Sequence, residues 1–351
     1  MERIKLLQQS LITHDESQLL IYDDSTISYL LQTPFSTGER FIGLLVSQQH
    51  DPILLCNHLF SIPPLLNTQV VLWADDENPL TILEPMLQMK VGVDKSIPSR
   101  FLLPLQNFNC NREFYLSELP DRLRAIKSSD EIDKMRRASA VNDQIMKELL
   151  EIIDGTQTER EIANLILSIQ KNHRVSPSFD PIVAFGDHAS DPHAIPTNRI
   201  VQIGEPILID MGCRLDGYCS DMTRTFFFEQ CLSPDLYYCV KTANENAIAA
   251  VHPGASFSSI DYAARSVFKE AGLANAFLHR TGHGIGLSVH EPYDVSATNL
   301  QSIEVGMCFS IEPGLYFPNE VGIRIEDLVA VTPEGVEVLN HFTKDLIISK
   351  L

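Results

Sequence analysis

The chain has 351 residues and a net charge of −19, from 27 basic and 46 acidic side chains. This length suits two domains, and the absence of any basic run argues against binding to nucleic acid or to an anionic membrane. The first residues lack the apolar segment of a secretion signal, and no apolar run is long enough to cross a bilayer, so we expect a cytoplasmic location.

Residues 1–120 alternate helical segments with short apolar runs, a pattern typical of an α/β domain. The predicted strands are 41–46, 53–56, 70–73 and 91–93. No phosphate-binding or dinucleotide-binding glycine motif occurs in this part of the sequence. The loop 33–41 carries Glu39 and Arg40, and its plainest interpretation is a solvent-exposed turn.

Residues 121–351 are predicted to form a second domain that opens with a long helix. Ser128 and Glu131 form a capping box at its start, and apolar residues then keep helical spacing. Further helices are predicted over 158–172, from 234 onward and over 256–272. Strands are predicted over 182–185, 206–211, 277–280, 307–313, 321–327, 328–331 and 336–339. This mixture indicates an α+β domain with a largely antiparallel sheet.

The segment 207–227 is predicted to form a β-hairpin, in which an apolar strand carries Asp210 and the returning strand carries Asp221. If residues 214–217 form the loop, the two aspartates face each other across the ladder. Two carboxylates about 5 Å apart repel by roughly 3 kcal/mol at an effective dielectric constant of about 20. We therefore expect a cation between them.

A second hairpin repeats this arrangement, because equal steps from a turn at Asn319 bring Glu312 opposite Glu326. Between the hairpins lies the segment 281–291, in which glycines flank His283 and would let the backbone approach a confined ion. Two aspartates, two glutamates and one histidine are more ligands than a single zinc ion needs. They suit a pair of Mn²⁺, Co²⁺ or Zn²⁺ ions about 3.5 Å apart.

Each of these residues has a plainer interpretation when it is taken alone. A single acid is most often a surface charge or a turn residue, and a histidine between glycines is more often structural than a ligand. The glycine-rich string around His283 also lacks the spacing of a dinucleotide-binding loop. Two hairpins with apposed acids in apolar strands are hard to explain without a cation, and this favours the metal site.

The same segments resemble those of a known family. The strings are ILIDMG, GYCSDMTRTF, RTGHGIGLSVHEPY, FSIEPGLYF and GIRIEDLVAV. In this order they are similar to the metal-binding segments of the pita-bread peptidases, in the branch that contains Xaa-Pro aminopeptidase and prolidase. The likeness is close over residues 120–345 and looser over 1–120. It implies a creatinase-type α/β domain followed by a pita-bread catalytic domain.

The resemblance also assigns a dinuclear metal site and the groups around it. It implies two divalent ions, with Mn²⁺ favoured and Co²⁺ or Zn²⁺ as alternatives. Their implied ligands are Asp210, Asp221, His283, Glu312 and Glu326. The outer residues that match are His193, His279, His290 and Arg324.

The outer residues receive roles by the same resemblance. We expect His290 to stabilise the oxyanion or to hold the scissile carbonyl, and Glu312 to carry the proton to the leaving nitrogen. His193 and Arg324 are expected to position the substrate and the ligands. His193, His279 and His290 are also expected to contact the substrate, a proline-containing dipeptide or longer peptide.

The length of the substrate is left open by the residues themselves. In prolidases of this branch a loop of the neighbouring subunit closes the pocket, and Glu39–Arg40 resembles such a loop. This implies a homodimer and favours a Xaa-Pro dipeptidase in which Arg40 binds the substrate carboxylate. Tyr293 stands where some bacterial prolidases carry a basic residue, which keeps a Xaa-Pro aminopeptidase as the alternative. A metal-free creatinase-like enzyme or a peptide-binding module is less favoured, because such relatives replace ligands that are present here.

Overall fold

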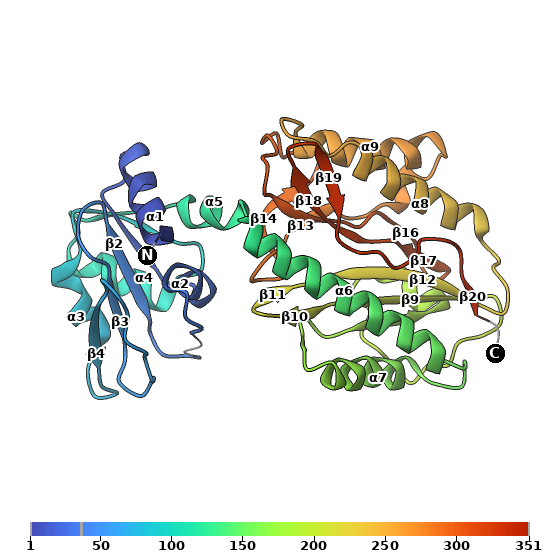
Figure 1. The fold of residues 1–351 in the computed structure, drawn as a ribbon, viewed down its shortest axis with the longest axis horizontal. Helices are drawn as coiled ribbons and strands as arrows, with labels where there is room; N and C mark the ends of the chain where they lie inside the picture. Colours follow the sequence, from blue (N-terminus) through green and yellow to red (C-terminus); the bar gives the residue numbers. More distant parts are fainter. Residues whose placement is uncertain (1, 36–37, 350–351) are drawn as a thin grey trace. The chain divides into compact units, whose positions relative to one another are not determined.

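The amino-terminal unit is built on a mixed sheet with the strand order β4-β3-β2-β1-β5-β6. The computed structural model describes residues 2–35 and 38–349, and the chain separates into residues 1–124 and 125–351 (Figure 1). The strands are β1 (Gln18–Ile21), β2 (Gly43–Ser47), β3 (Ile53–Asn57), β4 (Gln69–Trp73), β5 (Lys90–Val93) and β6 (Glu113–Leu116). The four strands predicted in this part of the chain are therefore confirmed as β2 to β5.

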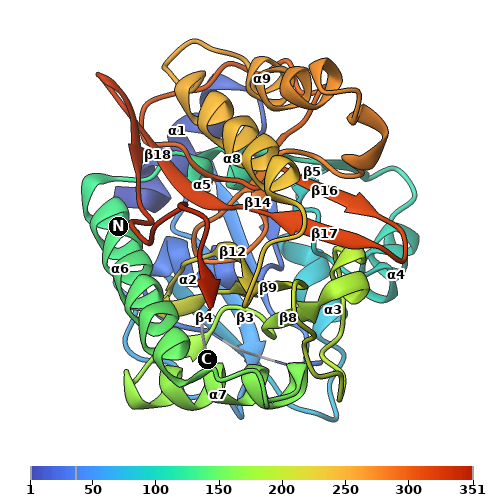
Figure 2. The same cartoon turned by 90° about the vertical axis from the view of Figure 1, so that its right-hand side faces the viewer.

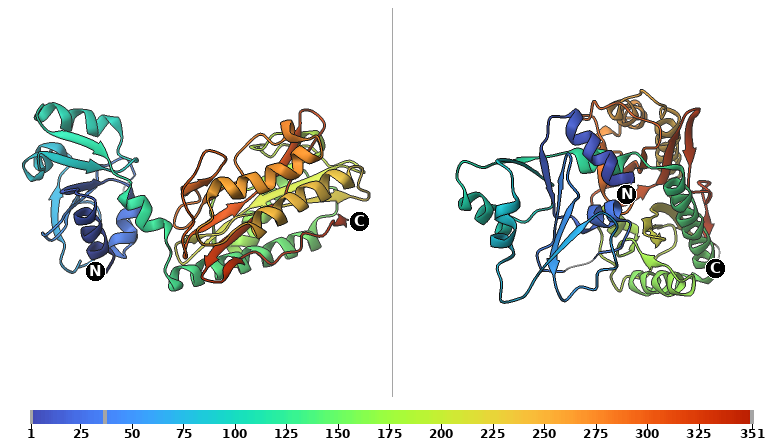
Figure 3. Two further views of the ribbon diagram at one scale, coloured as in Figure 1. Left: turned by 90° about the horizontal axis from the view of Figure 1, so that it is seen from above. Right: turned by 60° about the vertical axis from the view of Figure 1, so that its left-hand side comes forward.

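Helices cover both faces of this sheet (Figure 3). They are α1 (Glu2–Thr13), α2 (Asp24–Leu31), α3 (Pro79–Leu83), α4 (Ser99–Phe108) and α5 (Leu119–Ala125). On one face Leu20 and Leu55 pack with Leu80 of α3 and Leu105 of α4, while α1 and α2 contact each other and α1 contacts β2. Alternate side chains of the central strands β1, β2 and β3 thus enter two apolar layers, as the α/β pattern predicted.

The helices of the carboxy-terminal unit begin where the capping residues predicted. They are α6 (Ser129–Ile152), α7 (Glu159–Asn172), α8 (Pro234–Ala249) and α9 (Phe257–Glu270). Ser128 and Glu131 form the predicted capping box of α6, and Thr158 and Glu161 form that of α7. Among the described residues, none of the helices is both long and apolar enough to span a membrane.

Two larger sheets form the centre of this unit, with the strand orders β20-β12-β9-β8 and β14-β13-β15-β18-β19. The first contains β8 (Ile182–Phe185), β9 (Pro206–Met211), β12 (Met222–Phe228) and β20 (Ile348–Ser349). The second contains β13 (Gly282–Gly284), β14 (Glu291–Val295), β15 (Cys308–Ile311), β18 (Asp327–Thr332) and β19 (Gly335–Val338). Smaller sheets are made by β7 (Ser176–Pro177), β10 (Cys213–Leu215) and β11 (Tyr218–Cys219), and by β16 (Gly314–Phe317) and β17 (Val321–Arg324).

The helices lie outside the two larger sheets, with α6 and α7 on one side and α8 and α9 on the other (Figures 1 and 2). Ile207 and Ile209 of β9 belong to the apolar core under α6 and α7, and Phe309 and Ile311 of β15 to the core under α8 and α9. Because side chains alternate along a strand, the residues between them point to the opposite faces, where the sheets approach each other. Asp210 lies on such a face.

One predicted strand does not form. Residues 277–280 follow the 3₁₀ turn η3 (Ala274–Ala276) and pair with no strand among the described residues. The guanidinium of Arg265 in α9 donates to the carbonyls of Phe277 and His279, at 3.4 and 2.6 Å. A side chain from a helix thus takes the place of a neighbouring strand, which the apolar pattern of the segment could not reveal.

Candidate metal centre

The turn of the first hairpin is shorter than predicted. Asp216 and Gly217 have φ values of 50° and 86°, and Leu215 pairs with Tyr218 across a two-residue turn. The prediction of a four-residue loop, 214–217, was therefore wrong. Asp-Gly adopts left-handed conformations at low cost, and two such residues in succession give a tight turn that fits the strand twist.

This turn moves the register by two residues and changes the neighbours of the aspartates. Asp210 of β9 pairs with Thr223 of β12, not with Asp221. Asp221 lies in the break between β11 and β12, beside Gly212, where the strands approach closely: a Cβ on Gly212 would lie 2.1 Å from the carbonyl oxygen of Ser220. The two aspartates are therefore offset along the hairpin.

The second hairpin has the predicted register. Gly314 pairs with Arg324, and Ile311 pairs with Asp327, so equal steps from the turn bring Glu312 level with Glu326. Both glutamates occupy the breaks between paired strands. Asn319 at the turn has a φ of 59°, a left-handed conformation that asparagine tolerates better than most residues.

Three of the predicted ligands converge between the two sheets. One ligand atom each from Asp221, His283 and Glu326 lies within 4.8 Å of the others, and all three residues are buried. The Nε2 atom of His283 is 3.8 Å from Asp221 Oδ2 and 3.8 Å from Glu312 Oε1. Asp210 is close enough for its charge to raise the pKa of Asp221 and Glu326.

The acids of this cluster have the properties expected of cation ligands. Asp210 Oδ1, Asp221 Oδ1 and Glu326 Oε1 are buried and have no hydrogen-bond partner among the described residues. Burial, and then the charges of Glu326 and Asp210, raise the pKa of Asp221 well above its ordinary value. Burial also raises the pKa of Glu326 well above its ordinary value. Unpaired buried carboxylates are costly, so this donor set fits a divalent cation.

His283 presents a neutral nitrogen to these acids. Its Nδ1 atom lies 3.1 Å from the carbonyl oxygen of Gly284, which assigns the proton to Nδ1 and leaves Nε2 as an acceptor. Burial, and then the charge of His290, lower the pKa of His283 to about 3. A Cβ on Gly282 would lie 1.8 Å from the carbonyl oxygen of Ser310, so glycine lets β13 come close to β15.

Arg324 of the second hairpin forms hydrogen bonds with two residues of the first hairpin. Its Nη2 atom donates to Asp210 Oδ2 at 2.7 Å, and its Nε atom donates to the hydroxyl of Thr223 at 3.0 Å. That hydroxyl donates in turn to Glu326 Oε2 at 2.7 Å. Thr223 was not among the predicted site residues. A two-residue turn at Asp216–Gly217 would have predicted it, because that register pairs Thr223 with Asp210.

Tyr316 is a second residue that the sequence did not indicate. Its hydroxyl oxygen accepts from Arg324 Nη1 at 2.8 Å and lies 2.9 Å from His279 Nε2. Since His279 Nδ1 donates to the carbonyl of Arg280 at 2.7 Å, the Tyr316 hydroxyl donates to Nε2. Burial, and then the charge of Arg324, lower the pKa of His279 to about 4, so this histidine is neutral.

His290 and His193 are both exposed. The ring of His290 is 4.3 Å from that of His283, at an interplanar angle of 71°. Burial, followed by the charge of Arg280, lowers the pKa of His290, and His193 contributes to the same shift. The backbone N–H of the exposed His193 donates to Asp191 Oδ1 at 2.9 Å. The charge of His193 also lowers the pKa of His279, so His193 is close enough to affect both of the other outer histidines.

Two segments of the chain match known sequence families. Residues 133–333 match metallopeptidase family M24, and residues 3–126 match the creatinase/prolidase N-terminal domain. The protein belongs to metallopeptidase family M24. Membership of this family implies divalent metal ions, in agreement with the donor set of the buried cluster.

Relatives of this M24 peptidase resemble it over most of their length. An uncharacterised peptidase of Staphylococcus aureus is 36% identical over 314 residues, which cover 87% of this chain and 89% of the relative. The crystal structure of the dipeptidase PepE from Mycobacterium ulcerans has a TM-score of 0.94 at 30% identity and covers 100% and 98% of the two chains. A prolidase from Thermococcus sibiricus has a TM-score of 0.91 at 30% identity and covers 99% and 98%.

Arg40 belongs to the amino-terminal unit of the M24 peptidase. Its Nε and Nη2 atoms each donate to Asp75, both at 2.9 Å, and Asn57 donates to the same carboxylate at 2.8 Å. The carbonyl of Glu39 accepts from Arg100 at 2.8 Å. Part of the predicted loop, residues 36–37, lies outside the described residues. A contact of Arg40 with substrate stays a prediction.

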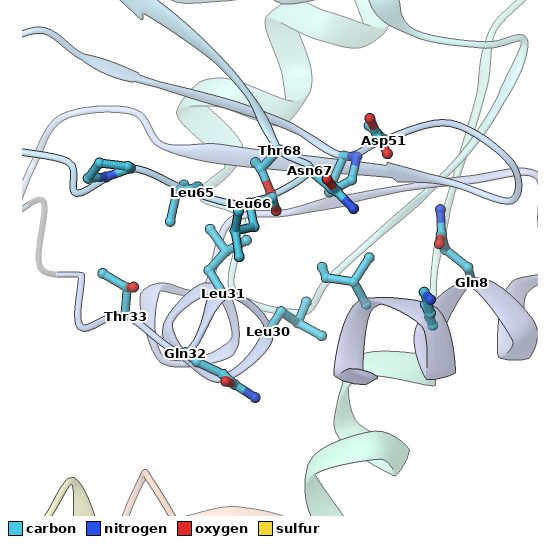
Figure 4. Close-up of a pocket in the computed structure, with 14 residues that line it drawn as sticks. Gln8, Leu30, Leu31, Gln32, Thr33, Asp51, Leu65, Leu66, Asn67 and Thr68 are labelled. Carbon is cyan, nitrogen blue, oxygen red and sulfur yellow. The ribbon is translucent and has the colours of Figure 1, made fainter. Parts of the chain in front are cut away.

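The amino-terminal unit also contains a cavity of about 280 Å³. Figure 4 shows Leu30 and Leu31 of α2, Gln8 of α1 and Leu66 and Asn67 around it. Lys5 and Asp51 supply charged groups to the lining. None of the predicted site residues is among the residues that line this cavity.

Proposed function

We propose that this M24 peptidase is a Xaa-Pro dipeptidase, which hydrolyses the peptide bond before proline with the help of two divalent ions. The observation that carries the proposal is the cluster of buried carboxylate oxygens around the neutral His283 that have no hydrogen-bond partner in the part of the chain that the structure describes. Two similar structures are named as a prolidase and a dipeptidase, which supports dipeptides as the substrates.

The ions would be held by residues of both hairpins and of the glycine-rich segment between them. These residues are Asp210, Asp221, His283, Glu312 and Glu326. A set of four carboxylates and one imidazole suits Mn²⁺ best, with Co²⁺ or Zn²⁺ as alternatives. When bound, such ions make a water molecule more acidic and polarise a substrate carbonyl.

The groups of the chain around the ions would bind the substrate and move its proton. His290 would donate a hydrogen bond to the oxyanion, and Glu312 would carry a proton to the departing proline nitrogen. Arg324 would hold Asp210 in place by their hydrogen bond of 2.7 Å. His193 would position the substrate, and His279 would contact it.

The substrate carboxylate is the feature that separates a dipeptide from a longer peptide. In a dipeptide it lies directly beyond the proline ring, where a pocket rich in acids would leave it unpaired at a high cost. We assign its recognition to Arg40 of the neighbouring subunit in a cytoplasmic homodimer. Asp75 engages Nε and Nη2 of Arg40, so Nη1 would make this contact.

Peptides of two lengths test the proposal. The purified protein, loaded with Mn²⁺, Co²⁺ or Zn²⁺, is given Xaa-Pro dipeptides and Xaa-Pro-Xaa tripeptides while bound metal is measured. Faster cleavage of dipeptides with close to two ions per chain is the expected result. Preference for tripeptides would favour the Xaa-Pro aminopeptidase that Tyr293 keeps as the alternative. A protein that binds no transition metal and cleaves neither peptide would refute the metallopeptidase proposal.

A further inference from the structure

Lys127 and Glu291 form an ion pair that is closed off from solvent. Lys127 Nζ lies 3.2 Å from Glu291 Oε2, and only 2% of each side chain is exposed. The backbone N–H of Lys127, just before α6, donates to the carbonyl of Gly306 at 2.8 Å. Desolvation makes a buried ion pair a poor source of stability, and apolar residues of similar size often stabilise a protein as well or better. These two charges therefore call for a role other than stability.

The carboxylate of Glu291 shapes the turn that precedes it. Its Oε1 atom accepts from the backbone N–H of Ser288 at 3.1 Å, and a Cβ on Gly286 would lie 2.7 Å from its Oε2 atom. The N–H of Gly286 donates to the carbonyl of Ser288 at 3.0 Å. Glu291 itself pairs with Gly284 where β14 meets β13. The carboxylate thus lies against Gly286 and binds the backbone of Ser288 in the middle of the turn 286–291.

His290 projects from this turn immediately before Glu291. Its ring packs edge to face against His283, with 4.3 Å between the ring centroids. The direction in which the His290 side chain leaves the backbone is set by the turn. The turn is held in place by the carboxylate of the next residue, and that carboxylate is held by Lys127.

We infer that Lys127 is a positioning residue for the hydrolysis proposed above, on which this inference rests. Through Glu291 it fixes the turn 286–291 and so places the imidazole of His290 against His283, where that ring can meet the substrate carbonyl. Among the described residues, Lys127 Nζ bonds Glu291, and Lys127 forms no hydrogen bond or ion pair with the candidate ligand residues or the outer histidines.

A double-mutant cycle in the metal-loaded, full-length protein tests this role. Lys127→Met is expected to lower kcat about tenfold or more, with KM and metal content close to those of the wild type. In the His290→Ala background, Lys127→Met should produce no further loss, because the residue through which it acts is gone. Multiplied losses in the double variant would overturn the inference. Met146→Ala, a truncation in the core under α6, is the matched control and should lower Tm while kcat stays unchanged.

A structural measurement keeps the test independent of activity. Should Lys127→Met not fold, Lys127→Met combined with Glu291→Gln removes the unpaired buried charge, while the amide oxygen can still accept from Ser288. Crystal structures of these variants are expected to show the His290 ring displaced from His283. A ring that keeps its wild-type position would overturn the inference. If instead the wild type cleaves no peptide but the ring moves in the variants, the proposed function fails and the positioning by Lys127 stands.

Discussion

At the scale of single residues, Asp221 provides the most direct test of the metal centre. Asp221→Asn keeps the shape of the side chain but removes the charge, so at least one ion and most of the activity should be lost. Metal analysis beside circular dichroism checks this, since the fold should be retained. Asp216→Asn, an exposed acid in the same hairpin, is the matched control and should keep the metal content of the wild type. Full activity without bound metal in Asp221→Asn would contradict the assignment.

The raised pKa of Glu312 leads us to expect that the stability of the metal-free protein depends on pH. Burial, with a further contribution from Asp210, raises its pKa from 4.5 to about 7. The folded protein therefore holds this proton more tightly than the unfolded chain, and ionisation of Glu312 lowers stability as pH rises from 4.5 to about 7.

Glu312→Gln should therefore stabilise the chelator-treated protein at about pH 8 and much less at about pH 5. The gain is at most about 3.5 kcal/mol, because one pKa unit corresponds to about 1.4 kcal/mol. The difference in Tm between this variant and the wild type measures the effect of the Glu312 charge, including its effect on the pKa of Asp221 and Glu326. An equal difference at both pH values would show that the carboxylate titrates normally.

His290 should affect turnover and leave metal binding intact. His290→Ala is expected to lower kcat by about 10² or more, the scale of losing one oxyanion donor. The exposed His252 supplies the control, since His252→Ala should change neither kcat nor metal content. Loss of metal together with activity would place His290 among the ligands and remove the role proposed for it.

At the scale of secondary-structure elements, the two hairpins show what the sequence could predict. The register of the second hairpin followed from counting outward from Asn319, because its turn is symmetric. The first was wrong by two residues because an Asp-Gly turn was treated as part of a longer loop. Contacts such as that of Tyr316 with Arg324 depend on how separate strands meet, and no local pattern encodes them.

The close approach of β13 to β15 predicts a strong effect of a single methyl group. In Gly282→Ala the new Cβ would meet the carbonyl oxygen of Ser310, so the strands must separate and His283 must move. We expect a loss of about 1–3 kcal/mol of stability together with metal. Gly254→Ala is the control: its Cβ would meet no described atom within 4 Å, and because its φ of +87° strains alanine it should lose stability but retain metal. Normal metal content in Gly282→Ala would show that the strand spacing does not position His283.

At the scale of the whole molecule, both segments that match known families were found from the sequence, the amino-terminal one more loosely. The family motifs lie in consecutive strands and keep their order along the chain, so they could be read without the fold. The domain boundary after residue 120 and the homodimer stay predictions. The boundary depends on contacts within the chain and the homodimer on contacts between two chains, and local sequence patterns specify neither.

Arg40 tests the proposed contribution of one subunit to the site of another. Arg40→Ala should lower kcat/KM for dipeptides about tenfold to a hundredfold, the range of a charged hydrogen bond, and should change tripeptide cleavage much less. Arg122→Ala, an exposed arginine in the same unit, is the control and should leave both substrates unaffected. Equal losses for both peptides, or none for either, would favour the aminopeptidase alternative.

The buried acids also imply that metal uptake releases protons. Glu312, with a pKa of about 7, and the raised pKa values of Asp221 and Glu326 mean that the metal-free centre binds protons more tightly than ordinary carboxyl groups do, and a cation must displace the protons that are bound. Calorimetric titration with Mn²⁺ in two buffers of different ionisation enthalpy would count these protons, and a heat of binding that is the same in both buffers would contradict the idea. For every proton displaced, metal affinity falls about tenfold with each unit by which the pH drops. The acidity of the surroundings, as well as the supply of metal, would then set how many molecules carry their ions.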